Sequence, residues 1–230
     1  AMRPSEARAL SQSDLVIWVG PALTPWLEDS LEALAPDAKR LTLADVGGLI
    51  RLPMRQGAAF EAHDHGHDHD HKHGHGHSHE EEGALDPHLW LDPENAKVWL
   101  AAIAEALASV DPDHASGYRA NAQRAQADLD TLSVQLAGDL DAVKGRPFIV
   151  FHDAYHYFEA RFGIEAVAAI TLGDAGTASA ARLSRVRDVV RETGAACALT
   201  EPSASAGLIE AVSDSVEIRV VELDPLGLGT

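Results

Sequence analysis

The second half of the chain opens on Phe148-Ile149-Val150-Phe151, four consecutive apolar residues that lead into His152. A short apolar run of this kind predicts a strand that is buried on both faces. The alternation continues with a helix that contains Tyr155, Phe158 and Phe162, strands at 166–170, 196–200 and 217–222, and a helix at 180–193. Strands that alternate with helices are typical of parallel sheets, so this half is expected to form an α/β lobe.

The first half of the chain shows the same alternation. Residues 14–19 predict a buried strand, Thr24-Pro25 predicts the start of an amphipathic helix, and residues 40–43 predict a second strand. Residues 113–143 are rich in alanine and contain no proline, which favours one long helix. The expected fold class is therefore α/β, with two parallel-sheet lobes joined by one long helix and a cleft between the lobes. The expected domains are an N-terminal lobe at 1–110, a linker helix at 111–143 and a C-terminal lobe at 144–230.

Charge and composition restrict the classes of partner. The 230 residues carry a net charge of −18, from 18 basic and 36 acidic side chains, and no basic patch stands out. A surface of this sign does not favour nucleic acid or anionic membranes as partners, and it concentrates cations. No apolar run approaches the roughly 20 residues that span a bilayer, so membrane insertion is not expected. The lone cysteine, Cys197, cannot form a disulfide within the chain.

A histidine-rich segment interrupts the first half, where the periodic pattern disappears between Arg51 and Gly83. From His63 to His79 histidine occupies every second position, and the residues between are Asp, Gly, Lys and Ser, none of which builds a core. Neutral imidazole is a common ligand for zinc, copper and nickel, so residues 61–82 are expected to form a loop that collects metal ions. An expression tag is the alternative, but tags lie at termini. The candidate ligands of this loop are His63, His65, His67, His69, His71, His73, His75, His77 and His79.

Three further side chains are candidate ligands on structured elements. His88 lies between a proline turn and an apolar tripeptide, and His152 ends a predicted strand. Asp224 follows the strand that ends at Leu223, and open α/β sheets bind ligands at the carboxyl ends of their strands. A lone histidine is more often a satisfied or surface side chain, and an aspartate before proline is more often a turn residue. His156 and His114 are expected to be partly or fully exposed.

Enzyme signatures are absent from the sequence. It contains no His-Glu-x-x-His, Gly-x-Ser-x-Gly, Walker or Gly-x-Gly-x-x-Gly motif, which argues against hydrolase and nucleotide chemistry. A zinc hydrolase with water on an open coordination position stays an alternative, although no general base or nucleophile can be named for it. We expect a protein that is not an enzyme.

Several motifs occur in a defined order along the whole chain. They are Met2 to Leu10, Val16-Ile17-Trp18-Val19-Gly20-Pro21, the histidine-rich segment, Asp86-Pro87-His88-Leu89-Trp90-Leu91, Phe151-His152-Asp153-Ala154-Tyr155, Thr200-Glu201-Pro202 and Leu223-Asp224-Pro225-Leu226-Gly227. Together they resemble the periplasmic zinc-binding proteins (ZnuA type) of bacterial ABC importers, within the cluster A-I metal-binding family.

This resemblance implies two α/β lobes linked by a rigid helix, with the metal held between them. It implies that His88 and His152 are two of three histidine ligands, and that Asp224 matches a carboxylate ligand of some relatives. A histidine rather than a carboxylate at 152 favours zinc. The implied function is capture of Zn(II) in the periplasm by a monomer, which delivers the ion to the membrane permease of an ABC importer.

The sequence departs from the family pattern at both ends. The family's first histidine lies just upstream of the segment that begins here at Arg3, and its last helix follows the position of Thr230. A second cysteine that pairs in some relatives with the one matching Cys197 would lie in that helix. We therefore expect a fragment of a longer protein, with a reduced site as the alternative. A cytosolic zinc or nickel storage or chaperone protein, with the histidine-rich loop as its main site, is the alternative function.

Overall fold

The computed structural model describes residues 2–60, 84–173, 178–202, 204–213 and 218–227. Contacts between Cα atoms divide the chain into two compact units. The first comprises Ala1–Leu52, Leu85–Ala142 and Ala160–Phe162, and the second comprises Pro53–Ala84, Val143–Glu159 and Gly163–Thr230. Among the described residues, no helix combines the length and the apolar character that a membrane span requires.

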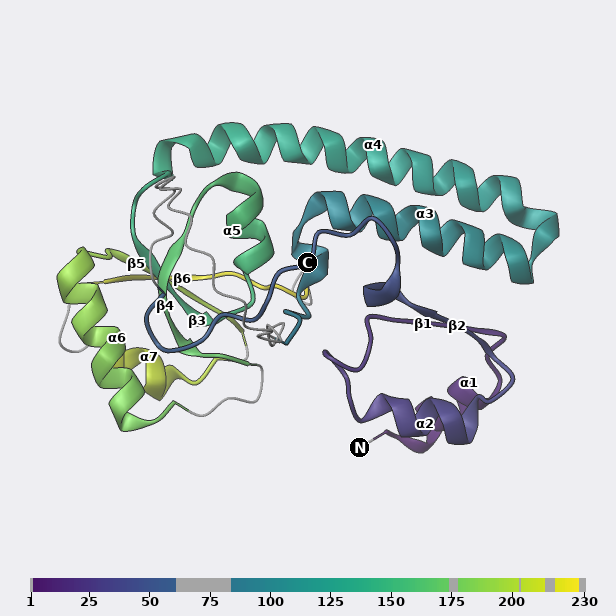
Figure 1. Cartoon of the computed structure of the whole chain (residues 1–230), viewed down its shortest axis with the longest axis horizontal. Coiled ribbons are helices and arrows are strands. Elements are labelled where there is room, and N and C mark those ends of the chain that lie inside the picture. The colour runs from purple at the N-terminus through teal and green to yellow at the C-terminus, as the bar shows by residue number, and fades with distance from the viewer. Residues whose placement is uncertain (1, 61–83, 174–177, 203, 214–217, 228–230) are drawn as a thin grey trace, which may run out of the picture. The chain divides into compact units, whose positions relative to one another are not determined.

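The elements follow one another in the alternating order that the sequence predicts (Figure 1). From the N-terminus they are α1 (Pro4–Ser11), β1 (Leu15–Trp18), α2 (Leu27–Leu34), β2 (Lys39–Thr42), η1 (Leu43–Asp45), η2 (Leu89–Leu91), α3 (Pro93–Val110), η3 (Pro112–His114), α4 (Ala115–Leu140), η4 (Asp141–Val143), β3 (Phe148–His152), α5 (His156–Phe162), β4 (Ala166–Thr171), α6 (Ala180–Thr193), β5 (Cys197–Thr200), α7 (Ala206–Ser213) and β6 (Arg219–Glu222). The short elements labelled η are 3-10 helices.

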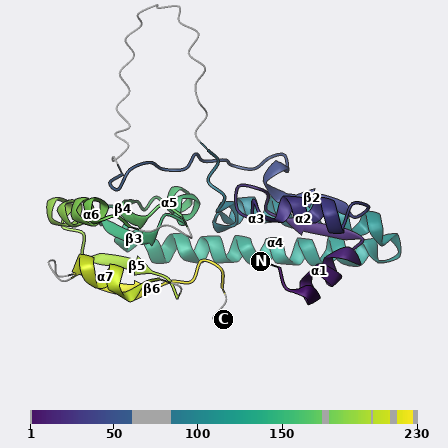
Figure 2. The ribbon, with the colours of Figure 1, turned by 90° about the horizontal axis from the view of Figure 1, so that it is seen from below.

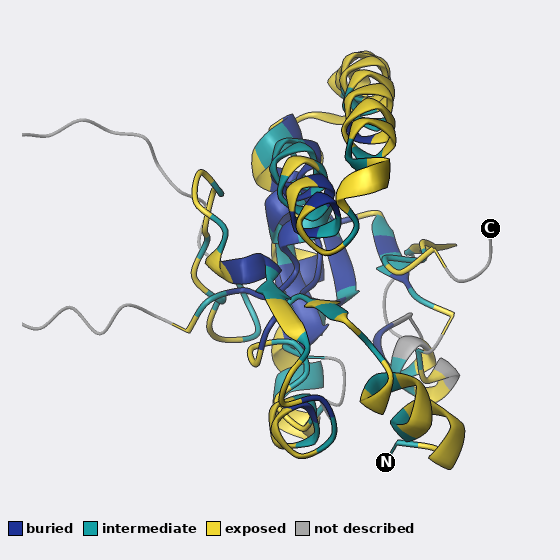
Figure 3. Ribbon diagram, turned by 90° about the vertical axis from the view of Figure 1, so that its right-hand side faces the viewer, coloured by how far each residue is buried: buried dark blue, intermediate teal, exposed yellow. Residues whose placement is uncertain are grey.

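The larger sheet lies in the second unit and has the strand order β4-β3-β5-β6. Every neighbouring pair in it is parallel, which confirms the predicted α/β class. Ile149 and Val150 of β3 are fully buried. Figure 3 draws buried residues in dark blue, and strands in the middle of the picture carry this colour. Valines of α6 and Val212 of α7 join Ile149 in one apolar cluster, so both helices cover this sheet.

The smaller sheet consists of β1 and β2, which are parallel. The prediction of a strand at residues 14–19 is confirmed by β1, but the prediction that it is buried is wrong, because no residue of β1 is buried and Ile17 is 36% exposed. A local apolar run specifies a strand, whereas burial depends on what covers it, and among the described residues β1 pairs with β2 alone. The helix expected from Thr24 begins instead at Leu27, and Trp26 is exposed while Leu31 is buried.

The predicted long helix is present as α4, which runs beside α3 (Figure 2). The α3 helix begins as its sequence indicates, because the Asp92 side chain accepts a hydrogen bond from the Glu94 backbone at 2.9 Å and Pro93 occupies the first turn. Trp99 of α3 is buried and donates its indole N–H to the Leu43 carbonyl at 2.9 Å. Most of α4 faces solvent, and Ala122 is buried.

Residues 58–60 lie along β4, although the sequence pattern predicts irregular structure from Arg51 onward. Ala59 forms an antiparallel bridge with Ala168, and the Phe60 backbone N–H donates to the Val167 carbonyl at 2.9 Å. Ala58 and Ala59 also pack against the apolar cluster of the second unit. We call residues 53–60 the stem segment; its last residues, 58–60, cover part of the outer edge of the sheet.

Candidate metal centre

His88 is a buried histidine whose ring is held by a neighbouring carboxylate. Its Nδ1 lies 2.7 Å from Oδ1 of Asp86, and the His88 backbone N–H donates to the same oxygen at 3.0 Å. His88 is 5% exposed and Asp86 is 2% exposed. Because the carboxylate engages Nδ1, it fixes the tautomer and leaves Nε2 as the nitrogen that can coordinate a metal.

The turn that carries His88 is fastened to α3. The Asn95 side chain donates to the carbonyls of Leu89, at 3.3 Å, and Ile50, at 2.9 Å, and accepts from the Ile50 backbone at 2.8 Å. The His88 ring also lies against Trp90, with ring centroids 5.4 Å apart. Asn95 thus holds the backbone of the turn and Trp90 packs against the ring, so the position of the imidazole is set by packing as well as by Asp86.

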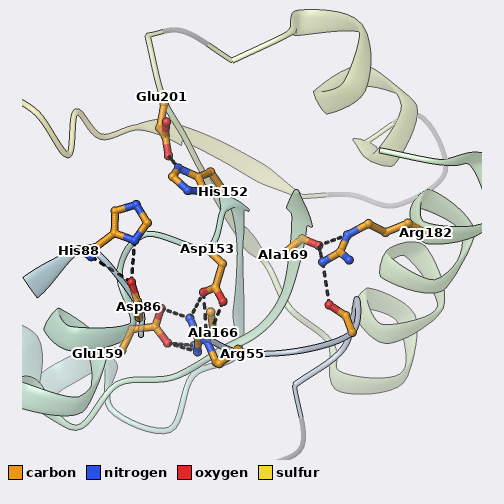
Figure 4. A network of polar contacts seen from close by, with 11 residues as sticks. Arg55, Asp86, His88, His152, Asp153, Glu159, Ala166, Ala169, Arg182 and Glu201 are labelled. Carbon is orange, nitrogen blue, oxygen red and sulfur yellow. Dashed lines mark hydrogen bonds and ion pairs between the residues drawn. The ribbon is translucent and has the colours of Figure 1, made fainter. Parts of the chain in front are cut away.

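His152 has the same arrangement at the carboxyl end of β3, in the second unit. It is 3% exposed, and its Nδ1 lies 3.2 Å from Oε1 of Glu201 (Figure 4). Glu201 directly follows β5, which pairs with β3, so the two side chains meet because neighbouring parallel strands end at one edge. The Nε2 atoms of His88 and of His152 are both buried.

Asp224 lies just after β6, at the same edge of the same sheet. Its Oδ1 accepts a hydrogen bond from the Leu226 backbone at 2.9 Å, which is the turn role that the sequence also suggested. A carboxylate has further lone pairs on both oxygens, so this turn does not exclude metal coordination. Tyr155 donates its hydroxyl to the Leu223 carbonyl at 2.9 Å and thereby fastens the segment before Asp224 to the turn after β3.

The electrostatic environment of this edge is negative. Burial raises the pKa of the Tyr155 hydroxyl, and the charges of Glu201 and Asp224 raise it further. A phenol in this setting stays protonated and keeps donating its hydrogen bond. The same two carboxylates would favour a bound cation.

The other histidines named by the sequence differ in their surroundings. His114 is exposed, as expected, with its Nδ1 2.8 Å from Asp111. His156 begins α5 and is half-buried, with its ring 6.4 Å from that of Tyr157. The histidine-rich segment 61–82, with His63 to His79, lies outside the described residues. In the described part of the chain, no group of three or more His, Cys, Asp or Glu side chains is arranged to hold a metal ion.

Sequence patterns did not identify Asp86 and Glu201 as functional residues. Asp86 stands two positions before His88, and this spacing was a usable signal. Glu201 is 49 residues from His152 and becomes its partner only through the pairing of β3 and β5. The free thiol of Cys197 is half-buried, and burial raises its pKa.

Comparison with known proteins identifies the family. The family described as "Zinc-uptake complex component A periplasmic" (ZnuA) matches residues 1–230. The high-affinity zinc uptake system protein ZnuA of Paracoccus denitrificans (strain Pd 1222) is 47% identical, over 99% of this chain and 73% of that protein. Its counterpart in Brucella abortus (strain 2308) is 42% identical over the same shares. A crystal structure of ZnuA, 25% identical, superposes with a TM-score of 0.79 and covers 99% of this chain and 77% of its own. The chain therefore belongs to the ZnuA family of periplasmic zinc-uptake components.

Proposed function

We propose that this protein captures Zn(II) in the periplasm and delivers it to the membrane permease of an ABC importer, with His88, His152 and Asp224 as ligands. The observation that carries the proposal is the pair of buried histidines, each held at Nδ1 by a carboxylate. Histidines that ligate zinc commonly donate their other nitrogen to a carboxylate in this way. Relatives named as high-affinity zinc uptake proteins support zinc as the ion.

The proposal assigns binding and transfer, and no catalytic step, to the protein. Two imidazole nitrogens and a carboxylate oxygen are ligands that zinc accepts in tetrahedral sites. The domain organisation expected from the sequence, with lobes at 1–110 and 144–230 and a linker helix at 111–143, is part of this proposal. So is a monomeric state in solution.

The histidine-rich segment 61–82 would collect zinc more weakly and raise its local concentration. Its nine histidines alternate with Asp, Gly, Lys and Ser, residue types that do not build a core. Fixing a residue that has no such packing costs roughly 1–2 kcal/mol, which would weaken zinc binding there. His88 and His152 need no such ordering, because their rings are already held. The two classes of site should therefore differ in affinity.

A zinc titration of the whole chain tests the ligand assignment. His88→Ala and His152→Ala should each weaken the tightest zinc site by at least about tenfold, which is about 1.4 kcal/mol. His114→Ala is the matched control, because it removes a histidine that is also paired with an aspartate but is exposed. Equal losses at all three positions would contradict the assignment. Asp224→Asn decides separately whether that carboxylate binds the metal.

Delivery to a permease needs its own measurement. Zinc-loaded protein should support uptake of radioactive zinc by proteoliposomes that contain the permease and its ATPase, and His152→Ala should reduce this uptake. A protein that binds zinc through 61–82 alone, as a storage protein would, should support no uptake.

A further inference from the structure

Arg55 lies in the stem segment and is enclosed by two acidic side chains. Its Nε contacts both oxygens of Asp153, at 3.0 and 3.2 Å, and its Nη2 contacts Asp153 as well. Its Nη1 and Nη2 donate to the two oxygens of Glu159, at 2.7 and 3.0 Å. Asp153 and Glu159 are buried, with side-chain exposed fractions of 4% and 2%, and Arg55 is partly buried, at 12%.

The two carboxylates connect Arg55 to the backbone that carries His152. Asp153 is the next residue after His152, and Figure 4 shows the two side chains leaving the end of β3 in different directions, His152 toward Glu201 and Asp153 toward Arg55. The Asp153 backbone N–H donates to the Thr171 carbonyl at 3.2 Å, at the end of β4. Glu159 accepts from the Ala166 backbone at 2.9 Å, at the start of β4.

We propose that Arg55 is a positioning residue for zinc binding: by holding Asp153 and Glu159 it fixes the turn after β3 and so the orientation of His152. This inference rests on the proposed role of His152 as a zinc ligand. Metal sites require their ligands to be held within about 0.5 Å of the productive geometry. Arg55 restrains His152 from the side opposite to Glu201, by fixing the residue that follows it.

The chemistry of the cluster requires arginine in particular. The planar guanidinium presents parallel N–H groups to both carboxylates at once, whereas the single ammonium of lysine cannot reach four oxygens in this geometry. A lysine keeps the positive charge, so Arg55→Lys tests the geometry and not the charge. Phe60 also stacks on the guanidinium, 4.0 Å from its central carbon, and this contact fixes its plane.

Arg182 of α6, which contacts the same stem segment through Gly57, provides a matched control. Its guanidinium donates to the carbonyls of Gly57, Ala169 and Ile170 at 2.8 to 3.1 Å. Arg182 therefore connects the stem segment to β4. Among the described residues it forms no hydrogen bond or ion pair with Asp153 or Glu159, and Asp153 acts on it only through its charge. Both Arg55→Lys and Arg182→Lys should loosen the stem segment. Only Arg55→Lys should also misplace His152.

The first experiment measures zinc affinity of the whole chain by competition with a chromophoric chelator. Arg55→Lys should raise the dissociation constant of the tightest site by about tenfold, the lower end of the usual effect of outer-shell partners. Arg182→Lys should change it by less than about twofold, the scatter expected for independent sites. The visible spectrum of bound Co(II) should also change in Arg55→Lys, because it reports the ligand geometry directly.

The second experiment separates positioning from a purely structural role. Arg55→Lys is combined with Glu201→Gln, which also acts through His152, and with Asp86→Asn, which acts through His88. The loss of zinc affinity caused by Arg55→Lys should be non-additive with the loss caused by Glu201→Gln. It should be additive, within about twofold in the dissociation constant, with the loss caused by Asp86→Asn. Additivity with both, or an unchanged zinc affinity in Arg55→Lys, would overturn the inference.

Two outcomes have to be separated from a failure of the inference itself. If Arg55→Lys fails to fold by circular dichroism, Asp153→Asn takes its place in the same cycle, since it keeps the side chain's shape and leaves Arg55 paired with Glu159. If His152→Ala leaves zinc binding intact, the ligand assignment in the proposed function is wrong, and that result is independent of any effect at Arg55.

Discussion

Replacing Asp86 by asparagine removes the charge beside His88 and keeps the shape of the side chain. Both contacts with His88, at 2.7 Å to Nδ1 and 3.0 Å to the backbone nitrogen, use the same oxygen, Oδ1. Asparagine retains this oxygen as a carbonyl, so both hydrogen bonds can persist. The variant therefore isolates the contribution of the negative charge.

The magnitude follows from the strength of the hydrogen bond. A hydrogen bond to a charged partner contributes about 1.5–3 kcal/mol, against about 1 kcal/mol between neutral groups. Zinc draws electron density from the ring, so the charged hydrogen bond matters most in the zinc-bound state. A difference of about 1–2 kcal/mol corresponds to about a five- to thirtyfold higher dissociation constant for zinc in Asp86→Asn.

Competition titration with a chromophoric chelator measures this change, and urea unfolding of the zinc-free protein checks the fold. Asp111→Asn is the control, because Asp111 pairs with Nδ1 of His114 in the same way at an exposed site. Glu201→Gln should have a smaller effect than Asp86→Asn, since its contact with His152 is longer, at 3.2 Å. A dissociation constant within about twofold of the wild-type value, in a folded Asp86→Asn protein, would refute the reasoning.

Three further outcomes are expected. Tyr155→Phe should lower the free energy of unfolding by about 1 kcal/mol, because the hydrogen bond to Leu223 is lost. In the wild-type protein the pKa of the Tyr155 hydroxyl is raised, so its contribution to the free energy of unfolding is fully present below the ordinary tyrosine pKa of about 10 and is lost as the pH rises from there through the raised pKa. The free energies of unfolding of wild type and variant, measured in urea, should therefore converge in alkali. Deletion of 61–82 should leave one tight zinc and remove weaker ones, as counted by calorimetry. Lowering the pH from about 8 to 5 should release zinc, because protons compete for imidazole nitrogens, and a flat stoichiometry would indicate carboxylate ligands instead.

The sequence predicted the larger sheet and the long helix because both depend on local signals. The apolar run at 148–151 has enough β-branched and aromatic residues to specify a strand, and it forms β3. The stretch that forms α4 lacks proline over its whole length, so nothing interrupts the helix. The position of His152 at the carboxyl end of a buried strand was also predicted correctly, since strand boundaries follow from the same run.

Burial and helix starts were less predictable. Ile17 belongs to an apolar run, yet it is 36% exposed, because burial of a strand depends on elements that its own residues do not encode. The start of α2 was placed at Thr24, but Trp26 precedes the first helical residue and the Thr24 side chain contacts the Gly20 carbonyl instead. A threonine can hydrogen-bond the backbone of a turn as readily as it caps a helix.

The polar partners of the candidate ligands were the least accessible to sequence reasoning. Arg55 is 98 residues from Asp153 and 104 from Glu159, and no spacing rule connects them. The stem segment that carries Arg55 has no strand periodicity. Its residues 58–60 are held because they pair with the outer edge of β4 and because Ala58 and Ala59 pack against the core. Contacts of this kind depend on the tertiary fold and not on local pattern.

The comparison of His88 with His114 shows why burial, rather than residue type, distinguishes a candidate ligand. Each histidine has its Nδ1 within 3 Å of an aspartate a few positions earlier in the chain. The His114 side chain is 74% exposed and the His88 side chain is 6% exposed. At the exposed site, solvent screens the charge of the Asp111 carboxylate, so its pairing with the His114 ring contributes little to stability. In the interior the same contact fixes both the tautomer and the direction of Nε2, so a zinc ion bound at His88, as proposed, would meet a nitrogen that is already oriented.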